Sequence, residues 1–177
     1  MLDTRTNTNV EVDSLEEVEV FEWLLKAKEL GIIVDFEYQP SSYVLFDGAK
    51  YKDSKGKDRC LFRDHIYSPD FAITFGISND RLLQEFKCPV IDEKKNTAKI
   101  VVDVKGVFMS NGSGRSFSLN QKWVFQKYGI YVYKLVPKDF FKRFGITESL
   151  LYTKKTKKPS SKYRGYLMIE DVFREER

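Results

Sequence analysis

Two short segments, in each of which an acidic residue stands where a strand meets a turn, constrain the fold of this chain most. Residues 67–71 read YSPDF and residues 101–106 read VVDVKG. Side chains alternate between the faces of a strand, so Asp103 and Lys105 project to one face and the intervening valines to the other. Two carboxylates and an ammonium gathered at one end of a sheet suit a hard divalent cation held beside a phosphate.

Each of these charged residues also has a simpler structural interpretation. Asp70 follows Pro69, which biases Ser68 toward an extended backbone, and by itself it indicates a strand-end turn aspartate. Asp103 and Lys105 could form a surface ion pair. The strand that precedes them is apolar enough to be central, however, which favours a functional pair at its end. Gly106 then lets the backbone turn close to a ligand.

The sequence predicts an amphipathic helix from Ser14 to about Leu30, with Ser14 as its N-cap and Gly31 as its stop. At 3.6 residues per turn, Glu17 is the one acidic residue centred on the apolar face, while the other glutamates cluster on the opposite side. A carboxylate facing a core is costly unless it is compensated, and a metal ion would compensate it. Glu17 could instead only close a capping box with Ser14. Glu19 replaces Glu17 as the candidate if the helix register is shifted.

The element order predicts a mixed α/β sheet core. The 177 residues divide into an N-terminal arm (1–13), a core domain (14–152) and a basic linker with a C-terminal extension (153–177). The expected elements are strands at 32–38 and 43–46, a polar hairpin loop or mobile insertion at 47–59, a strand within 65–75, a short helix at 80–86, a strand at 99–105, a flexible turn at 110–116, a helix at 117–128, a strand at 130–136, a helix at 137–144 and a strand or helix within 163–173.

Composition excludes several classes of protein. A hydrophobic content of 42% supports a folded core, and no apolar run approaches the roughly 20 residues that span a bilayer. The polar N-terminus is neither a signal nor a transit peptide, so we expect a cytoplasmic protein. Cys60 and Cys88 lack metal-type spacing and are expected to be free thiols, with a disulfide as the lesser alternative. His65 is the one histidine, so any metal would be bound through oxygen.

The charge of the chain is concentrated in one block. Residues 105–165 carry 14 Lys or Arg against 2 Asp or Glu, a net charge of +12, whereas residues 1–104 carry 14 against 20, a net of −6. Such a block indicates an anion-binding face, most simply one for nucleic acid, with a solvated basic surface as the alternative. Within the block, the lysines predicted to contact phosphates or to form a disordered tail are Lys154, Lys155, Lys157 and Lys158.

The order of these motifs resembles that of the PD-(D/E)xK nuclease superfamily, especially small phage and prophage endonucleases, the endonuclease domain of some transposition proteins and phage junction-resolving endonucleases. The similarity covers roughly residues 14–136. Its parts are Ser14-x-x-Glu17-Val18, a helix ending at Gly31-x-Ile33, Glu37-x-Gln39-Pro40, Tyr67-x-Pro69-Asp70-Phe71 and Val102-Asp103-Val104-Lys105-Gly106. The chain departs from compact relatives in the 32 residues between Asp70 and Asp103 and in its basic tail.

The resemblance implies a restriction-endonuclease-like core, in which helices flank a mixed central β-sheet, with a basic C-terminal extension. It implies that Glu17, Asp70 and Asp103 ligate Mg²⁺ or Mn²⁺, that the Val104 carbonyl adds a ligand, and that Lys105 positions or activates the attacking water. No membrane partner is expected. Residues expected on the DNA-binding side are Gln121, Lys122 and Arg115, in addition to the tail lysines.

The implied function is a divalent-metal-dependent DNA endonuclease, encoded by a phage or mobile element, with branched DNA as a candidate substrate. A homodimer is a reasonable expectation for an enzyme that cuts both strands. Two alternatives remain open at this point. One is a catalytically inactive nucleic-acid-binding module of the same fold, and the other is a protein-interaction factor whose basic block meets an acidic partner.

Overall fold

The computed structural model describes residues 2–3, 8–9, 14–86, 88–106, 111–153 and 158–174, with side chains described from residue 14 onward and, in helix α3, from residue 116. The helices are α1 (Leu15–Glu29), α2 (Asp80–Glu85), α3 (Asn111–Tyr128), α4 (Pro137–Phe144), the 3₁₀ turn η1 (Glu148–Leu151) and α5 (Ile169–Val172). The strands are β1 (Leu2–Asp3), β2 (Thr8–Asn9), β3 (Asp35–Tyr38), β4 (Tyr43–Phe46), β5 (Ala49–Lys52), β6 (Asp58–Phe62), β7 (His65–Tyr67), β8 (Phe71–Gly76), β9 (Val90–Asp92), β10 (Thr97–Val104) and β11 (Val132–Leu135).

Local signals account for the bounds of several elements. Helix α1 begins directly after Ser14, whose hydroxyl accepts a hydrogen bond from the Glu17 N–H, and it gives way to Gly31 at a φ of 72°. This left-handed conformation suits glycine. Helix α4 begins at Pro137, as predicted, since proline fits the first helical position. Strand β4 also has the predicted bounds.

The central sheet is mixed, which confirms the predicted α/β class. Its strand order is β11-β10-β8-β3, and β9 pairs with the first half of β10. The β3–β8 and β8–β10 pairs are antiparallel, whereas β10 and β11 are parallel and are joined through α3. A parallel pair needs such a crossover, because a tight turn cannot connect strands that run in the same direction.

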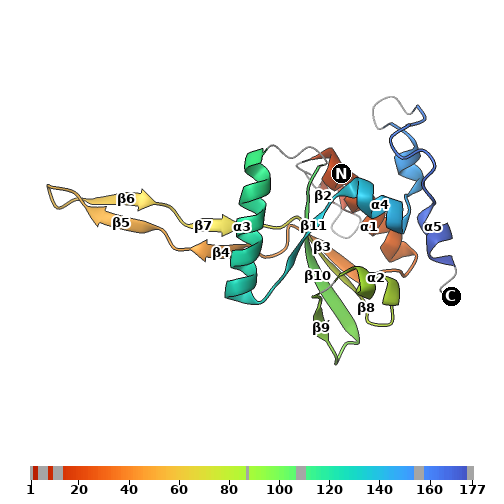
Figure 1. The fold of residues 1–177 in the computed structure, drawn as a ribbon, viewed down its shortest axis with the longest axis horizontal. Helices are drawn as coiled ribbons and strands as arrows, with labels where there is room; N and C mark the ends of the chain where they lie inside the picture. The colour runs from red at the N-terminus through yellow and green to blue at the C-terminus, as the bar shows by residue number, and fades with distance from the viewer. Residues whose placement is uncertain are drawn as a thin grey trace.

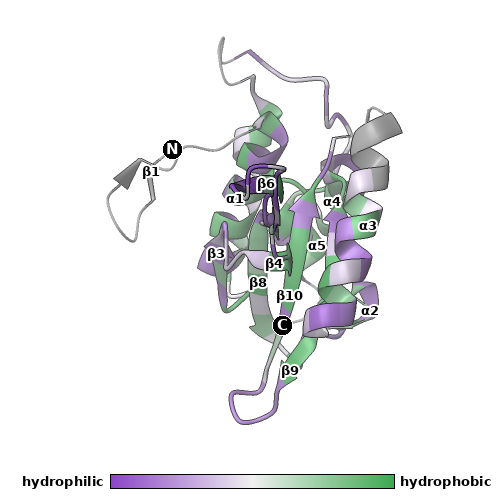
Figure 2. Cartoon of the chain, turned by 90° about the vertical axis from the view of Figure 1, so that its left-hand side faces the viewer, coloured by the Kyte–Doolittle hydropathy of each residue, from purple (hydrophilic) through white to green (hydrophobic). Residues whose placement is uncertain are grey.

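Helices cover both faces of this sheet, with α3 on one side and α1, α4 and α5 on the other (Figure 1). The alternation along β10 divides its side chains between two cores. Val102 belongs to the larger core with residues of α1 and α4, and Val101 belongs to the smaller core with Val124 of α3. Strands β8 and β10 lie as apolar ribbons between the helical layers (Figure 2). Side chains along β10 therefore alternate between the two faces of the sheet. Asp103 is two residues after Val101, so both side chains lie on the α3 face.

Strands β4 to β7 form a long two-stranded arm, residues 43–67, that projects away from the sheet (Figure 1). The predicted polar hairpin at 47–59 is thus an ordered ribbon, and every residue of β6 is exposed. Helix α3 supports the base of the arm, because Lys127 Nζ and Tyr128 Oη both donate to the Val44 carbonyl at 2.8 Å.

The described part of the C-terminal segment, residues 158–174, packs on the main core. Tyr163, Ile169 and Phe173 are buried there with residues of α1 and α4. The chain passes very close to Gly145, where an added Cβ would lie 2.7 Å from the Ile169 nitrogen. The domain boundary expected at residue 152 therefore lies inside one packed unit.

One predicted element is wrong. The flexible turn expected at 110–116 overlaps α3, which begins at Asn111. Glycine and serine lower helix propensity by only about 1 kcal/mol each or less, and packing of the later turns of the same helix outweighs this cost. Phe117 and Val124 supply that packing in the smaller core.

Among the described residues, no helix combines the length and the apolar character that crossing a bilayer requires. Cys60 and Cys88 are both exposed and free.

Candidate active site at the end of the central sheet

The pairing of β8 with β10 brings together two aspartates that are far apart in the sequence. Val102 lies opposite Phe71 in the last pair of the antiparallel register, and Asp103 and Asp70 are the next residues of the two chain segments beyond that pair. The Asp70 N–H donates to the Val102 carbonyl at 3.1 Å, and the Val104 N–H donates to Asp70 Oδ2 at 2.6 Å. The two carboxyl groups lie close enough for Asp103 to act on the ionisation of Asp70. Both stand on the α3 face of the sheet, where strand β10 ends.

This juxtaposition disfavours ionisation of Asp70. Its pKa is raised to about 8, and burial is the largest cause, followed by the interactions with the Asp103 carboxyl group and its charge and then by the charge of Glu17. The Val104 N–H acts in the opposite direction, because it stabilises the carboxylate. Near neutral pH the pair therefore retains a proton unless a cation takes its place.

Asp103 is the more deeply held of the two acids, with only 3% of its surface exposed. The Tyr67 hydroxyl donates to its Oδ2 at 2.6 Å, and the Lys105 ammonium pairs with its Oδ1. Burial, and then the charge of Asp103, raises the pKa of Tyr67, so that the phenol remains a donor. About a third of the Lys105 side chain is open to solvent, at 30% exposure. A substrate phosphate could therefore reach its ammonium.

Glu17 is buried at the same end of the sheet. Ser14 Oγ accepts the Glu17 N–H at 3.1 Å and donates to Glu17 Oε1 at 2.8 Å, so Glu17 takes part in the N-cap, and its Oε2 accepts from Tyr38 Oη at 3.1 Å. Its charge acts on Asp70, as noted above. The capping role and the position near the aspartates thus coexist. In the described part of the chain, no three side chains of His, Cys, Asp or Glu form a group that could hold a metal ion as they stand.

Glu17 is not the only acid buried along α1, contrary to the helical-wheel prediction. Glu19 is 8% exposed and accepts from Lys162 Nζ at 2.7 and 2.9 Å and from Tyr163 Oη at 2.5 Å. The wheel assigned this side of α1 to solvent, because it could not foresee that residues 158–174 cover it. Glu19, the substitute candidate, is therefore engaged by the C-terminal segment.

The predicted nucleic-acid contacts lie in different settings. Gln121 Nε2 donates to the Val132 carbonyl at 2.6 Å, which holds α3 to β11, whereas Lys122 and Lys158 are exposed. The side chain of Arg115, like Lys154, Lys155 and Lys157, lies outside the described residues. His65 packs as a structural histidine, with its Nε2 2.9 Å from Asn120 Oδ1.

Sequence reasoning missed Tyr67 and Tyr38, the two phenols that hold the acids. Tyr67 belongs to β7 and not to β8, so alternation along one strand gives no sign of its orientation. A break at Ser68-Pro69 separates it from Asp70. Gln39, with a φ of 46°, supports this corner: its N–H donates to the Asp70 carbonyl at 2.7 Å. No local sequence signal identifies these contacts, because they join three separate segments.

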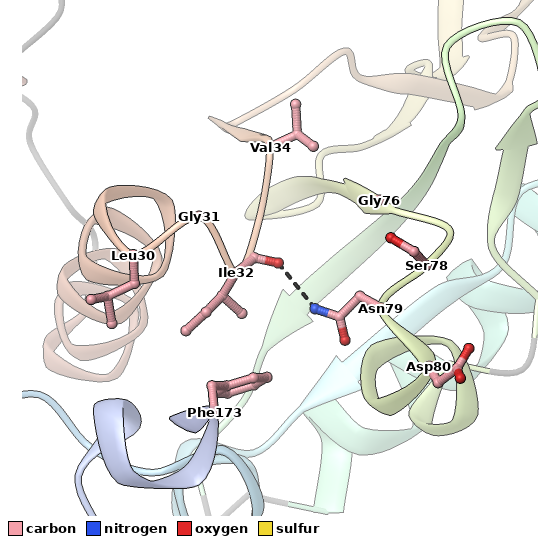
Figure 3. A pocket seen from close by; sticks show the side chains of 9 residues that line it. All are labelled: Leu30, Gly31, Ile32, Val34, Gly76, Ser78, Asn79, Asp80 and Phe173. Atoms are coloured by element: carbon pink, nitrogen blue, oxygen red, sulfur yellow. Dashed lines mark hydrogen bonds between the residues drawn. The ribbon is translucent and has the colours of Figure 1, made fainter. Parts of the chain in front are cut away.

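A separate hollow of about 670 Å³ lies at the opposite end of β8 and α1 (Figure 3). Gly76, Leu30 and Phe173 line it, and the Asn79 amide beside it donates to the Ile32 carbonyl at 3.1 Å. Asp80 is the one acidic residue in its wall. This hollow therefore lacks the paired acids and the ammonium of the Asp70–Asp103 site.

Comparison of the chain with protein-family models, with curated proteins and with solved structures finds no match.

Proposed function

We propose that this chain is a divalent-metal-dependent deoxyribonuclease that hydrolyses phosphodiester bonds within DNA. The element order α1-β3-β8-β10-α3-β11, with the sheet order β11-β10-β8-β3, supports a restriction-endonuclease-like core. The two aspartates of the PD-(D/E)xK-like motif lie just before β8 and near the end of β10, which also supports the proposal.

The opposed carboxyl groups of Asp70 and Asp103 carry this proposal. Like charges held side by side at the ends of neighbouring strands are destabilising, and burial adds to the cost. A hard cation between them would relieve the repulsion, and Lys105 alone pairs with only one of the four oxygens.

The residues present fit Mg²⁺ or Mn²⁺, because the donor set is made of oxygen alone. Asp70 and Asp103 would hold the ion, with the Val104 carbonyl as a further donor. Glu17 is bound to Ser14 and Tyr38, so it would act through a water molecule or after turning from them. Mg²⁺ keeps several waters and needs only one or two carboxylates, which suits this arrangement. When bound, the ion would lower the pKa of a water and neutralise charge on the phosphate.

The side chains around the ion have distinct tasks in this mechanism. Lys105, fixed by its pair with Asp103, would orient the attacking water and stabilise the charge that develops on the phosphate. Tyr67 would hold the Asp103 carboxylate in one rotamer. The water oxygen would form the new bond to phosphorus and release a proton to solvent, the bond to the leaving sugar oxygen would break, and that oxygen would take a proton from solvent.

One observation favours the alternative, a catalytically inactive nucleic-acid-binding module. Asp103 is already bound by Tyr67 and Lys105, and Glu17 is bound by Ser14 and Tyr38. Asp70 accepts the Val104 N–H, so all four converging groups have protein partners. Such contacts would hold the corner together without any ion.

Nuclease assays separate the two. Plasmid and four-way-junction DNA are incubated with the full chain in Mg²⁺, Mn²⁺ or EDTA, with Lys105→Ala as the test variant. Lys99→Ala is the matched control, since Lys99 lies on the same strand and pairs with the exposed Glu37 at 2.9 Å. We expect metal-dependent cutting that Lys105→Ala reduces at least ~100-fold and Lys99→Ala preserves. Binding without cutting in either metal would support the inactive module.

Branched-DNA preference and a homodimer belong to the same proposal. Cutting both strands of a duplex at one place needs two copies of this site. A preference for the junction over the plasmid in the same assay would support the branched substrate.

A further inference from the structure

The projecting arm, residues 43–67, has features that the proposed chemistry does not require. Beyond its base on α3, the ribbon of β5 and β6 makes no contact that would bury it, and all nine residues of these strands except Ala49 are exposed. At about 3.3 Å per residue, the eight residues from Gly48 to Lys55 extend it by roughly 25 Å. A ribbon of this length is a costly feature unless something binds it.

The tip of the arm is built to hold one shape. Asp53 Oδ1 accepts the N–H groups of Lys55 and Lys57 at 2.9 and 3.0 Å, and Asp53 Oδ2 accepts from Arg59 Nε at 2.9 Å. Gly56 completes the turn with a φ of 73°. These contacts lower the pKa of Asp53, with the Lys57 N–H as the largest cause, so the carboxylate that holds the tip stays charged. The turn is therefore preorganised and does not need a partner to form.

Among the side chains that the structure describes, the charged ones of the ribbon that have no partner of opposite charge are basic. Residues 50–59 carry five Lys or Arg and two Asp. Both acids are used internally, since Asp53 holds the tip and Asp58 lies 3.7 Å from Lys52 Nζ. Within the described part of the chain, no acidic side chain pairs with Lys50, Lys55 or Lys57. Three unpaired ammonium groups thus line the outer half of the arm.

The two faces of the ribbon differ. Paired residues share a face, so Lys50 lies beside Cys60, and Tyr51 lies beside Arg59 on the other face. Tyr51 is 50% exposed. One face therefore offers an ammonium, and the other offers an aromatic ring next to a guanidinium.

We propose that the arm is a groove-binding element for duplex DNA. A two-stranded ribbon fits the major groove of B-DNA, which is about 12 Å wide, whereas the deep, narrow major groove of duplex RNA does not admit it. Lys50, Lys55 and Lys57 would contact phosphates, and Tyr51 with Arg59 would face the base edges or the sugars. A second copy of the arm is a poorer partner, because two positively charged tips repel each other.

The arm is connected directly to the acid pair. Tyr67 is the last residue of β7, and its hydroxyl binds Asp103 Oδ2 at 2.6 Å. Three residues later the chain reaches Asp70. A duplex held along the arm would accordingly present its backbone at the Asp70–Asp103 site. This step rests on the proposed nuclease function, whereas duplex binding by the arm does not.

The test is duplex binding by the full chain in EDTA, measured by fluorescence anisotropy with a 30-base-pair DNA. Lys50, Lys55 and Lys57 are changed together to Gln, and the matched control changes three exposed lysines away from the arm, Lys94, Lys138 and Lys142. We expect the arm variant to bind at least ~10-fold more weakly at 0.15 M salt and to lose about 3 from the slope of log K against log salt. The control variant should stay within ~3-fold of the wild type. Thermal melting checks that both variants fold.

Crosslinking gives a second readout that does not depend on affinity. Cys60 and Cys88 are both exposed, so a thiol-linked photocrosslinker can be placed on the arm in a Cys88→Ser variant or away from it in a Cys60→Ser variant. The Cys60 label should crosslink to the duplex far more efficiently than the Cys88 label, and an RNA duplex should crosslink weakly.

Equal weakening by the arm and control variants, or equal crosslinking from both cysteines, would overturn the groove assignment. Sedimentation that shows the wild type self-associating without DNA, and the arm variant not, would assign the arm to a second copy of the chain instead. Arm-dependent binding without cutting in Mg²⁺ would contradict the nuclease function and leave the arm assignment intact. Metal-dependent cutting by a protein whose DNA binding does not depend on the arm would contradict the arm assignment and leave the nuclease function intact.

Discussion

The opposed pair of aspartates makes the stability of the metal-free protein depend on pH in an unusual direction. An isolated aspartate titrates near 3.8, whereas Asp70 in the folded protein titrates at about 8. Because its folded pKa is the higher one, folding takes up a proton between these two values. The free energy of unfolding should therefore fall as the pH rises from about 4 to about 8, and stay level above that.

Asp70→Asn should remove this loss. The neutral amide can still accept the Val104 N–H and donate to Asp103, so the hydrogen bonds survive while the repulsion disappears. The interval between 3.8 and about 8 corresponds to at most about 6 kcal/mol at 1.36 kcal/mol per pH unit. Solvent reaches part of the Asp70 carboxyl group and screens its interactions. We therefore expect about half of this maximum effect on the free energy of unfolding, roughly 3 kcal/mol. That equals about 6–12 °C in melting temperature for a chain of this size.

Urea unfolding in EDTA at pH 5 and pH 8.5 measures the effect. The rise from pH 5 to about 8 covers about three pH units of this interval, so the variant should gain about 2 kcal/mol relative to the wild type between the two pH values. Millimolar Mg²⁺ at pH 8.5 should stabilise the wild type more than the variant, since a bound cation takes over the role of the proton. Glu37→Gln on β3, an exposed carboxylate paired with Lys99, is the matched control and should show no such pH dependence. A variant-to-wild-type difference that is equal at both pH values would refute the account of the pair.

Two further predictions concern single contacts. Tyr67→Phe removes the donor to the buried Asp103, so it should cost about 1–3 kcal/mol in urea unfolding and reduce metal-dependent cutting. Tyr43→Phe removes the phenol of the residue paired with Tyr67 on β4, which is not a donor to Asp103, and it should leave cutting unchanged. Unchanged stability in Tyr67→Phe would mean that the hydroxyl does not hold the carboxylate. Gly145→Ala should destabilise the protein by more than 2 kcal/mol, because the added Cβ would lie 2.7 Å from the Ile169 backbone and φ is 78°. Gly56→Ala is the control: its φ is 73° but the space around it is open, so it should cost only about 1 kcal/mol. Equal losses at the two glycines would show that backbone conformation, and not the approach of Ile169, sets the cost.

Much of the local structure follows from neighbouring residues alone. Ser14 and Gly31 bound α1, and Pro137 starts α4, because capping and the restrictions on proline act within one turn of the chain. Alternation along β10 placed Asp103 and Lys105 on one face, because that depends only on strand geometry. The oxygen-only donor set likewise follows from having one histidine and two separated cysteines.

Other features required the tertiary structure. The pairing of β8 with β10 decided that Asp70 faces Asp103, and packing of residues 158–174 buried Glu19 on a side of α1 that its own periodicity assigned to water. Tyr67 reaches Asp103 from a different strand, and the ribbon at 43–67 leaves the core beside the acids. Strand register and burial depend on contacts between distant segments, whose free energies no local pattern contains. The sequence by itself therefore determined which chemical groups are available, and the fold decided which of them meet.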